Sequence, residues 1–215
     1  MREYDDFREY YMNLNPNKLY LPKMIQFTHF RIWAPRPIKM HRILKTKTEV
    51  RDMLAHYGPM HAFYVTSYFL QPDKLGPRGH DGARFLYSSE FIIDLDSKSG
   101  SLDEEIKYDT LEIIKFMRDY FAVEPKAIVY SGQKGFHLHY PFPLGEFKLP
   151  TTEEETIFLK EKLVKLIESA TGICVDEPVS KDTRRLIRIP GSIHGKTGNL
   201  VEKINEDEIM NYTPK

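Results

Sequence analysis

Cysteine is almost missing from this chain, with Cys174 the only one among 215 residues. A single cysteine excludes an internal disulfide framework and any zinc site built from several cysteines, and it fits a reducing, intracellular compartment. No apolar run is long enough to span a bilayer, so no membrane partner is expected. Residues 1–6 are polar, which predicts that there is no secretory signal.

An excess of charge is also missing, because 31 Lys and Arg balance 31 Asp and Glu. The balance argues against a protein that is basic over its whole surface, yet residues 10–48 contain no acid. That segment can hold phosphates and stack unpaired bases, or it can be a solvated face whose aromatics enter the core. Its basic and aromatic residues are Lys18, Lys23, Arg31, Arg36, Lys39, Arg42, Lys45, Lys47, Tyr10, Tyr11, Tyr20, Phe27, Phe30 and Trp33.

Repeats, low-complexity tracts and Gly/Ser-rich linkers do not occur either. With 41% hydrophobic residues, the chain is expected to form one domain over residues 1–215. Helical periodicity predicts a helix with a Ser101–Glu104 capping box that ends near Phe121, and a second from a Thr152–Glu155 box to Gly172. Residues 5–14 and 48–56 favour two weaker helices.

Short apolar runs predict strands among these helices. Stretches with Pro and Gly at 71–82 and 141–150 are expected to be loops. Because helices and strands interleave, the expected fold class is α/β, with a mixed sheet flanked by helices, and the strand order stays open. The predicted strands are residues 62–70, 90–95, 127–131, 136–140 and 186–189.

Two carboxylates stand at the end of the apolar run 91–96. Because side chains alternate along a strand, Asp94 and Asp96 should share one face while Phe91, Ile93 and Leu95 share the other. Ionised carboxylates held together repel one another, and a divalent cation with oxygen ligands removes that repulsion. The alternative is that one Asp caps a turn and the other is solvated.

A glycine-bearing turn follows the strand predicted at 127–131. Gly132 and Gly135 allow a tight hairpin, after which alternation puts His137 on the face opposite Phe136. Ser131, Lys134 and His137 could then converge on an anion, because hydroxyl, ammonium and imidazole groups all donate to phosphate oxygens. The alternative is an ordinary hairpin with surface histidines.

Residues 176–198 combine a carboxylate, Asp176, with a run of basic side chains. A basic loop beside an acidic metal site is the electrostatics expected for binding a triphosphate. Residues 191–197 look like a P-loop but have three residues between the glycines where four are needed, and Pro190 stands at the first glycine position. An ATPase P-loop is therefore rejected, although Lys196 remains a candidate phosphate ligand.

Taken in order, these motifs resemble the catalytic small subunit of the archaeo-eukaryotic primases, from about residue 26 to residue 200. Residues 91–96 match the family's Asp-x-Asp motif. Residues 131–137 match its Ser-Gly-Arg-Arg-Gly-x-His motif, with Gln133 and Lys134 in place of the arginines. The third motif is matched by residues 176–179 and 185–198, and looser matches lie at 31–34 and 61–72.

The resemblance implies a primase-polymerase catalytic core that uses Mg²⁺ or Mn²⁺. It implies single-stranded DNA template and nucleoside triphosphates as partners, and a large primase subunit is a further candidate. The family's cysteine/histidine zinc module has no counterpart in residues 97–105, so no zinc is expected. The implied metal ligands are Asp94, Asp96 and Asp176, and the implied triphosphate ligands are Ser131, Lys134, His137, Arg188, His194 and Lys196.

The expected function is that of a template-dependent nucleotidyltransferase, which synthesises RNA or DNA primers on single-stranded DNA by two-metal-ion catalysis. One alternative is a gap-filling or mobile-element primase-polymerase that extends existing primers with deoxynucleotides. Another, of a different class, is a non-catalytic nucleic-acid-binding module.

Overall fold

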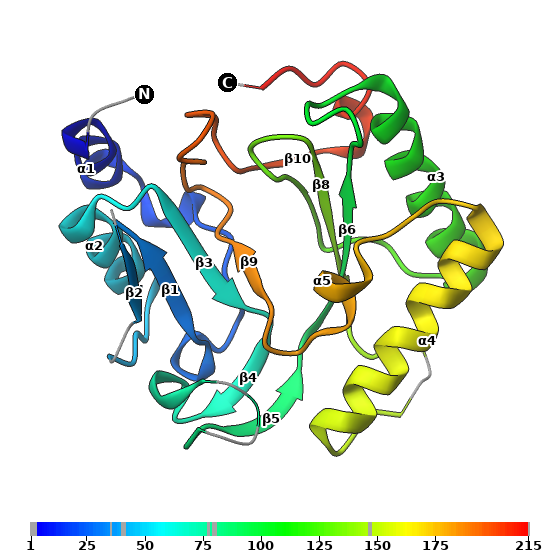
Figure 1. Ribbon diagram of the computed structural model, residues 1–215, viewed down its shortest axis with the longest axis horizontal. Coiled ribbons are helices and arrows are strands. Elements are labelled where there is room, and N and C mark those ends of the chain that lie inside the picture. Colours follow the sequence, from blue (N-terminus) through cyan, green and yellow to red (C-terminus); the bar gives the residue numbers. More distant parts are fainter. Residues whose placement is uncertain are drawn as a thin grey trace.

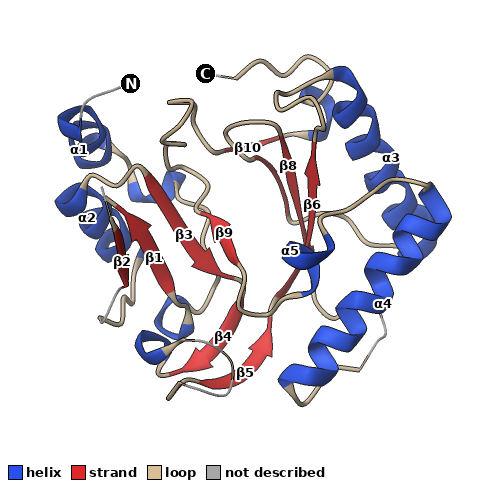
Figure 2. Cartoon of the chain, viewed as in Figure 1, coloured by secondary structure: helices blue, strands red, loops and turns tan. Residues whose placement is uncertain are grey.

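Two four-stranded sheets face each other, and each carries helices on its outer side (Figure 1). The structure is a computed structural model, which describes residues 4–34, 36–39, 42–76, 78, 81–145 and 148–214. Helices and strands interleave along the chain, as the α/β prediction requires (Figure 2). All pairs among the described strands are antiparallel, so the sheet that was expected to be mixed is two antiparallel sheets.

The first sheet has the strand order β2-β1-β3-β9. Its members are β1 (Phe30–Trp33), β2 (Pro37–Lys39), β3 (His61–Val65) and β9 (Leu186–Arg188). Helices α1 (Tyr4–Asn13) and α2 (Lys47–Tyr57) pack on its outer face. Ile32, Ala62, Tyr64 and Ile187 point into the core beneath those helices. The alternate residues of these strands therefore face the second sheet.

The second sheet has the strand order β10-β7-β8-β6. It contains β6 (Glu90–Asp96), β7 (Ala127–Tyr130), β8 (Gly135–Pro141) and β10 (Glu202–Ile204). Helices α3 (Glu104–Phe121) and α4 (Glu153–Thr171) cover it. Phe91, Ile93 and Leu95 lie in the core under those helices, as alternation predicted. The hairpin predicted around Gly132 is confirmed as β7 and β8, with Tyr130 opposite Phe136.

The single strand predicted at 62–70 is wrong. The chain instead forms β3 and then β4 (Ser67–Leu70), and β4 leaves the first sheet to pair with β5 (Arg84–Ser88). Val65, Tyr68 and Phe69 are all buried, so the apolar run continues across the change of sheet and hides it. The loop predicted at 71–82 contains a short 3₁₀ helix at Pro72–Lys74, and part of it lies outside the described residues.

The helix boundaries show which caps formed. The predicted Ser101–Glu104 capping box is wrong, because Asp103 is the N-cap of α3 and accepts a hydrogen bond from Ile106 N at 3.0 Å. The Thr152–Glu155 box and the end at Gly172 are confirmed, and Gly172 has a φ of +74°. Helices α1 and α2 confirm the two weaker predictions.

Sequence patterns missed the strands β1, β2, β5 and β10 and the short helix α5 (Glu177–Lys181). Each of these elements is short, which leaves too few residues for a periodic pattern to show. No helix among the described residues has both the length and the apolar character needed to cross a membrane.

Candidate active site

The carboxylates of Asp94 and Asp96 lie on the inner face of β6. Each is held in register by β8, with Asp94 opposite His137 and Asp96 opposite Gly135. Asp94 is buried and Asp96 is partly exposed. The inward orientation follows from alternation along the strand, since residues 91, 93 and 95 occupy the core side.

Asp176 joins this pair through backbone contacts that the sequence does not reveal. Its amide donates to the carbonyl oxygen of Asp94 at 3.0 Å, and the amide of Asp94 donates to Ser180 Oγ at 3.4 Å. Asp176 is also the N-cap of α5, because its Oδ1 accepts from Val179 N. One carboxylate oxygen from each of Asp94, Asp96 and Asp176 lies within 4.8 Å of the other two.

These three residues fit a divalent cation. Burial, followed by the charges of Asp96 and Asp176, raises the pKa of Asp94 well above its ordinary value. The buried Oδ1 of Asp94 accepts no hydrogen bond from any described residue. Carboxylate oxygens are the ligands that hard divalent cations prefer, and an ion shared by the three would offset their mutual repulsion.

The β7–β8 hairpin brings a lysine and a histidine to the carboxylates. Lys134 Nζ lies 2.9 Å from Asp96 Oδ2, and this contact raises the pKa of Lys134. His137 Nε2 lies 3.5 Å from Asp94 Oδ1, but burial lowers the pKa of His137 to about 3. A neutral imidazole at that distance is not an ion pair. Its Nδ1 is buried and has no hydrogen-bond partner in the described chain.

The facing wall of the site comes from the first sheet. Where β9 pairs with β3, Arg188 lies opposite Phe63, and the Arg188 guanidinium lies over the Phe63 ring, 5.0 Å from its centre. Arg188 Nη1 also donates to His61 Nδ1 at 2.9 Å. Burial, with Arg188 and Lys196 nearby, lowers the pKa of His61 to about 4. The acceptor nitrogen of His61 therefore stays unprotonated and orients the guanidinium.

His194 completes this wall from the loop after β9. Its ring contacts that of His61 edge-on at 5.4 Å, and burial lowers the pKa of His194 to about 3. Gly132 of the hairpin approaches so closely that a Cβ there would lie 2.6 Å from His194 Cβ. Thr197 Oγ1 donates to the Gly132 carbonyl at 2.7 Å. These contacts join the loop after β9 to the hairpin.

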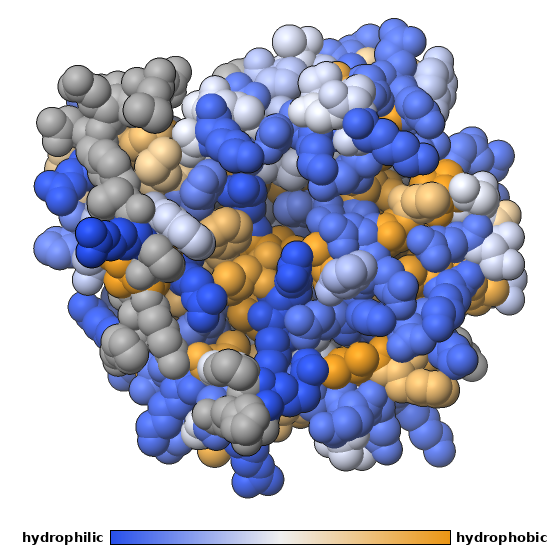
Figure 3. Space-filling view, viewed as in Figure 1, coloured by the Kyte–Doolittle hydropathy of each residue, from blue (hydrophilic) through white to orange (hydrophobic). Residues whose placement is uncertain are grey.

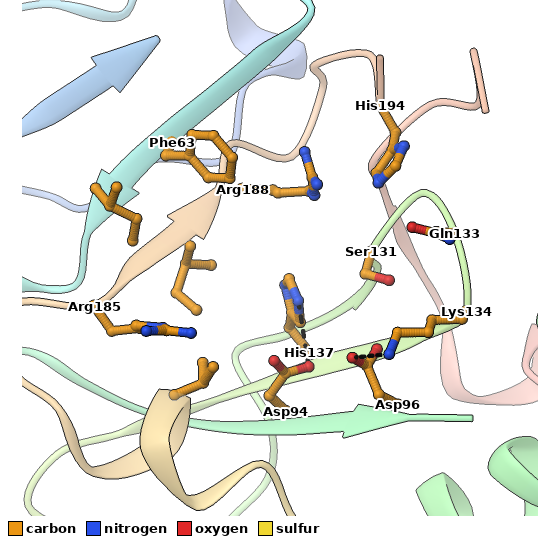
Figure 4. Close-up of a pocket in the computed structure, with 13 residues that line it drawn as sticks. Phe63, Asp94, Asp96, Ser131, Gln133, Lys134, His137, Arg185, Arg188 and His194 are labelled. Atoms are coloured by element: carbon orange, nitrogen blue, oxygen red, sulfur yellow. Dashed lines mark ion pairs between the residues drawn. The ribbon is translucent and has the colours of Figure 1, made fainter. Parts of the chain in front are cut away.

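A pocket of about 180 Å³ lies between the two walls. In Figure 3, apolar side chains are visible in the middle of this face, between the sheets, with hydrophilic side chains around them. Figure 4 shows the labelled side chains around the pocket, with Lys134 beside Asp96 and His137 beside Asp94. The lining residues are Phe63, Asp94, Asp96, Ser131, Gln133, Lys134, His137, Val179, Arg185, Leu186, Ile187, Arg188 and His194.

Seven of the nine residues predicted for the site line this pocket, and Asp176 reaches it through the carboxylate cluster. Lys196 is exposed and does not line the pocket, although its charge acts on His61 and His194. The predicted set of site residues did not include Phe63, and it left out Gln133 and Arg185 although both stand in the matched motifs. Alternation along β3 and β9 could have placed Phe63 once those strands were known, but their pairing is not visible in the sequence.

The basic segment at residues 10–48 is divided between core and cleft. Tyr11 and Phe30 are buried, as the alternative interpretation supposed. Arg31 and Trp33 lie on the inner face of β1, with Arg31 opposite Phe63 and Trp33 opposite His61. Trp33 is 43% exposed, so an aromatic and a cation continue the pocket wall along the sheet. The side chain of Lys39 lies outside the described residues.

Comparison with known proteins gives relatives over most of the chain. It is 26% identical to the DNA primase small subunit PriS of Archaeoglobus fulgidus, covering 95% of this chain and 80% of that protein. It is 25% identical to PriS of Thermoplasma volcanium, and the match covers 97% of this chain and 78% of that protein. No family model matches the chain.

Solved structures of other proteins share the fold over most of the chain. The polymerase domain of Mycobacterium tuberculosis Ligase D, solved with DNA, superposes with a TM-score of 0.66 at 15% identity, over 98% of this chain and 84% of that one. The primase-polymerase domain of cyanophage S-2L superposes with a TM-score of 0.52 at 17% identity, over 87% of this chain and 89% of that one. At these identities the two likenesses show the fold, which this chain shares with a polymerase domain and a primase-polymerase domain.

The sequence similarity adds to this likeness of fold. The chain is a relative of the archaeal DNA primase small subunits, and the predicted resemblance is confirmed. This similarity to primases indicates a nucleotidyltransferase enzyme.

Proposed function

We propose that this chain adds nucleotides to a primer strand along a single-stranded DNA template, with Asp94, Asp96 and Asp176 as ligands of Mg²⁺ or Mn²⁺. The observation that supports the proposal most strongly is that one pocket brings this carboxylate cluster together with cationic and hydrogen-bonding side chains. A nucleoside triphosphate with its cation needs both kinds of group within a few ångströms.

In the proposed reaction a 3′-oxygen forms a bond to the α-phosphorus of the nucleotide. The bond from that phosphorus to the bridging oxygen of the β-phosphate breaks, pyrophosphate leaves with the electron pair, and the hydroxyl proton passes to water. Divalent ions, when bound, would lower the pKa of the 3′-hydroxyl and neutralise charge on the leaving group. Asp94 and Asp96 line that site between the two sheets.

Side chains around the carboxylates would bind and orient the phosphates. Lys134 already lies 2.9 Å from Asp96, so a triphosphate that reaches the site can exchange one anionic partner of Lys134 for another. Arg188 is fixed between Phe63 and His61, which directs its remaining donors into the pocket. Ser131, His137 and His194 would add neutral hydrogen bonds, with Lys196 at the margin.

The template would lie along the inner face of β1. Arg31 can bind a backbone phosphate, and the exposed ring of Trp33 can stack on an unpaired base. Both residues share the sheet face that carries Phe63 and His61, so a strand bound there leads directly into the pocket.

The test is incorporation of labelled nucleotides on single-stranded DNA, with and without an annealed primer and with Mg²⁺ or Mn²⁺. Asp94→Ala and Asp96→Ala should each lower incorporation by several orders of magnitude. Asp119→Ala is the matched control, because it removes an exposed carboxylate from α3 on the outer side of the second sheet. Full activity in either site variant would refute the metal assignment.

The same assay separates primer synthesis from gap filling. A primase should start chains without a primer, whereas a gap-filling enzyme should only extend an annealed 3′ end. Comparing ribonucleotides with deoxyribonucleotides in both arms identifies the sugar that the pocket accepts. Adding a large primase subunit tests whether that partner is needed for initiation.

A further inference from the structure

The pocket differs on the two sides of its carboxylates. Figure 4 shows Lys134, Ser131, Gln133 and His194 on the Asp96 side, while Arg185 approaches from the Asp94 side. Leu186, which follows Arg185 in the chain, and Val179 add apolar lining to the pocket. Three of the proposed triphosphate ligands, Ser131, Lys134 and His194, therefore lie toward the Asp96 end, while His137 lies beside Asp94. Arg185 stands at the opposite end from those three.

Arg185 is free to bind a ligand. Its guanidinium forms no ion pair or side-chain hydrogen bond with any residue in the described ranges, although it points into the pocket beside a buried carboxylate. The positive charge of Arg185 acts on Asp94 through space, without a direct contact, and it partly offsets the rise in the pKa of Asp94. Its five donors are therefore available to an anionic partner.

The residue before it explains why Arg185 points inward. Arg184 turns away from the pocket and binds Glu153 with two parallel hydrogen bonds of 2.8 Å. Its Nη1 also donates to Asp81 Oδ2 at 2.7 Å and to the carbonyl oxygen of Gly76 at 3.1 Å. Thr183 Oγ1 adds a 2.6 Å hydrogen bond to Glu153. This anchor fixes the backbone from which Arg185 projects to the other side.

In-line nucleotidyl transfer places the attacking hydroxyl and the leaving pyrophosphate on opposite sides of the α-phosphorus. If the triphosphate occupies the Lys134 end, the attacking strand must enter from the other side of the carboxylates. We propose that Arg185 binds the 3′-terminal phosphodiester of the primer strand, and that the Arg184–Glu153 anchor positions it. The assignment rests on the proposed function, which supplies the polarity of the pocket.

The experiment measures binding and catalysis separately. Fluorescence anisotropy gives the affinity for a recessed-3′ primer–template whose last phosphodiester is native or is an uncharged methylphosphonate. A methylphosphonate five linkages upstream controls for the modification. Steady-state extension gives KM for the primer–template and for the incoming nucleotide. The proteins compared are wild type, Arg185→Ala, Arg185→Lys and Arg8→Ala, a control that removes an exposed arginine from α1.

Arg185→Ala should weaken primer–template binding about tenfold, as expected for one lost charge-assisted phosphate contact, and leave the nucleotide KM within twofold. The terminal methylphosphonate should weaken wild type by a similar factor and cause no further loss in Arg185→Ala. Arg185→Lys should recover part of the affinity, and Arg8→Ala should match wild type.

Other outcomes overturn the assignment. These are an unchanged primer affinity in Arg185→Ala, a loss confined to the nucleotide KM, a terminal methylphosphonate penalty that persists in the variant, and failure of wild type to bind the primer–template. Urea unfolding of Arg185→Ala shows whether a loss of primer affinity reflects misfolding. If it does, the primer affinity of Arg185→Lys tests the assignment instead. Absence of incorporation by wild type would refute the proposed function, while the binding measurements would still test Arg185.

Discussion

Gly135 offers the sharpest test of how the fold places the carboxylates. It stands directly opposite Asp96 in the β6–β8 ladder. A Cβ at this position would lie 1.8 Å from the carbonyl oxygen of Leu95 and 2.9 Å from Asp96 Oδ1. Real Cβ contacts are essentially never shorter than 3.0 Å, so Gly135→Ala must move β6 and β8 apart by at least about 1.2 Å at this point.

This shift falls at the proposed metal site, because Asp96 is the residue opposite Gly135 and Lys134 is the residue before it. A misplacement of about 1 Å at a reacting centre lowers rates about 100-fold. We therefore expect Gly135→Ala to lower kcat/KM for extension about 100-fold. Overpacking should also reduce the free energy of unfolding by about 1–3 kcal/mol.

The assay is single-nucleotide extension under conditions in which urea unfolding shows the variant to be fully folded. Gly100→Ala is the control, because Gly100 follows the same strand with a φ of +83°, and a Cβ there would have no neighbouring atom within 4 Å. That variant should lose about 1 kcal/mol of stability and keep its activity. If Gly135→Ala stays folded with more than half of the wild-type rate, the reasoning is refuted.

Three further predictions follow from contacts around the site. Arg184→Ala should lower the free energy of unfolding in urea by about 3 kcal/mol, because Glu153 and Asp81 lose their shared buried partner. Burial lowers the pKa of Lys160 from 10.5 to about 7, so between those pH values the unfolded chain binds the proton more tightly than the folded chain. The free energy of unfolding should therefore rise by up to about 4 kcal/mol from pH 7 to pH 10.5. Urea titrations at several pH values should show that Lys160→Met flattens this rise. Mn²⁺ at 100 times its dissociation constant should stabilise the wild-type protein against thermal unfolding by about 2.7 kcal/mol. Asp96→Asn should abolish this stabilisation, because it removes one carboxylate of the cluster. An equal stabilisation of the variant would count against the carboxylate site.

Local sequence patterns predicted much of the second sheet. The stretch 91–96 was expected to put apolar residues on one face and Asp94 with Asp96 on the other, and the structure has that arrangement. The hairpin around Gly132 and the capping box at Thr152 were also confirmed. These features depend on residues within a few positions of one another, so period-two alternation and cap chemistry are sufficient to reveal them.

The first sheet was poorly predicted for the opposite reason. Strands β1 and β2 are short, and the apolar run at 62–70 conceals the point at which the chain changes sheets. Phe63 and Arg188 meet only because β3 pairs with β9, about 125 positions further along the chain. Such pairing depends on the packing of whole elements, and no pattern within one segment encodes it.

The sequence by itself determined the chemical groups of this protein and the local geometry of two carboxylates, because both are properties of neighbouring residues on one strand. Only the tertiary structure decided that Asp176 joins them, through a backbone hydrogen bond to Asp94. It also decided that Arg188 of β9 and Arg185, just before β9, reach the same pocket at different places around the cluster. The physical reason is that a divalent site and its substrate need charges brought together from distant segments, and only the closing of two sheets on one another achieves this.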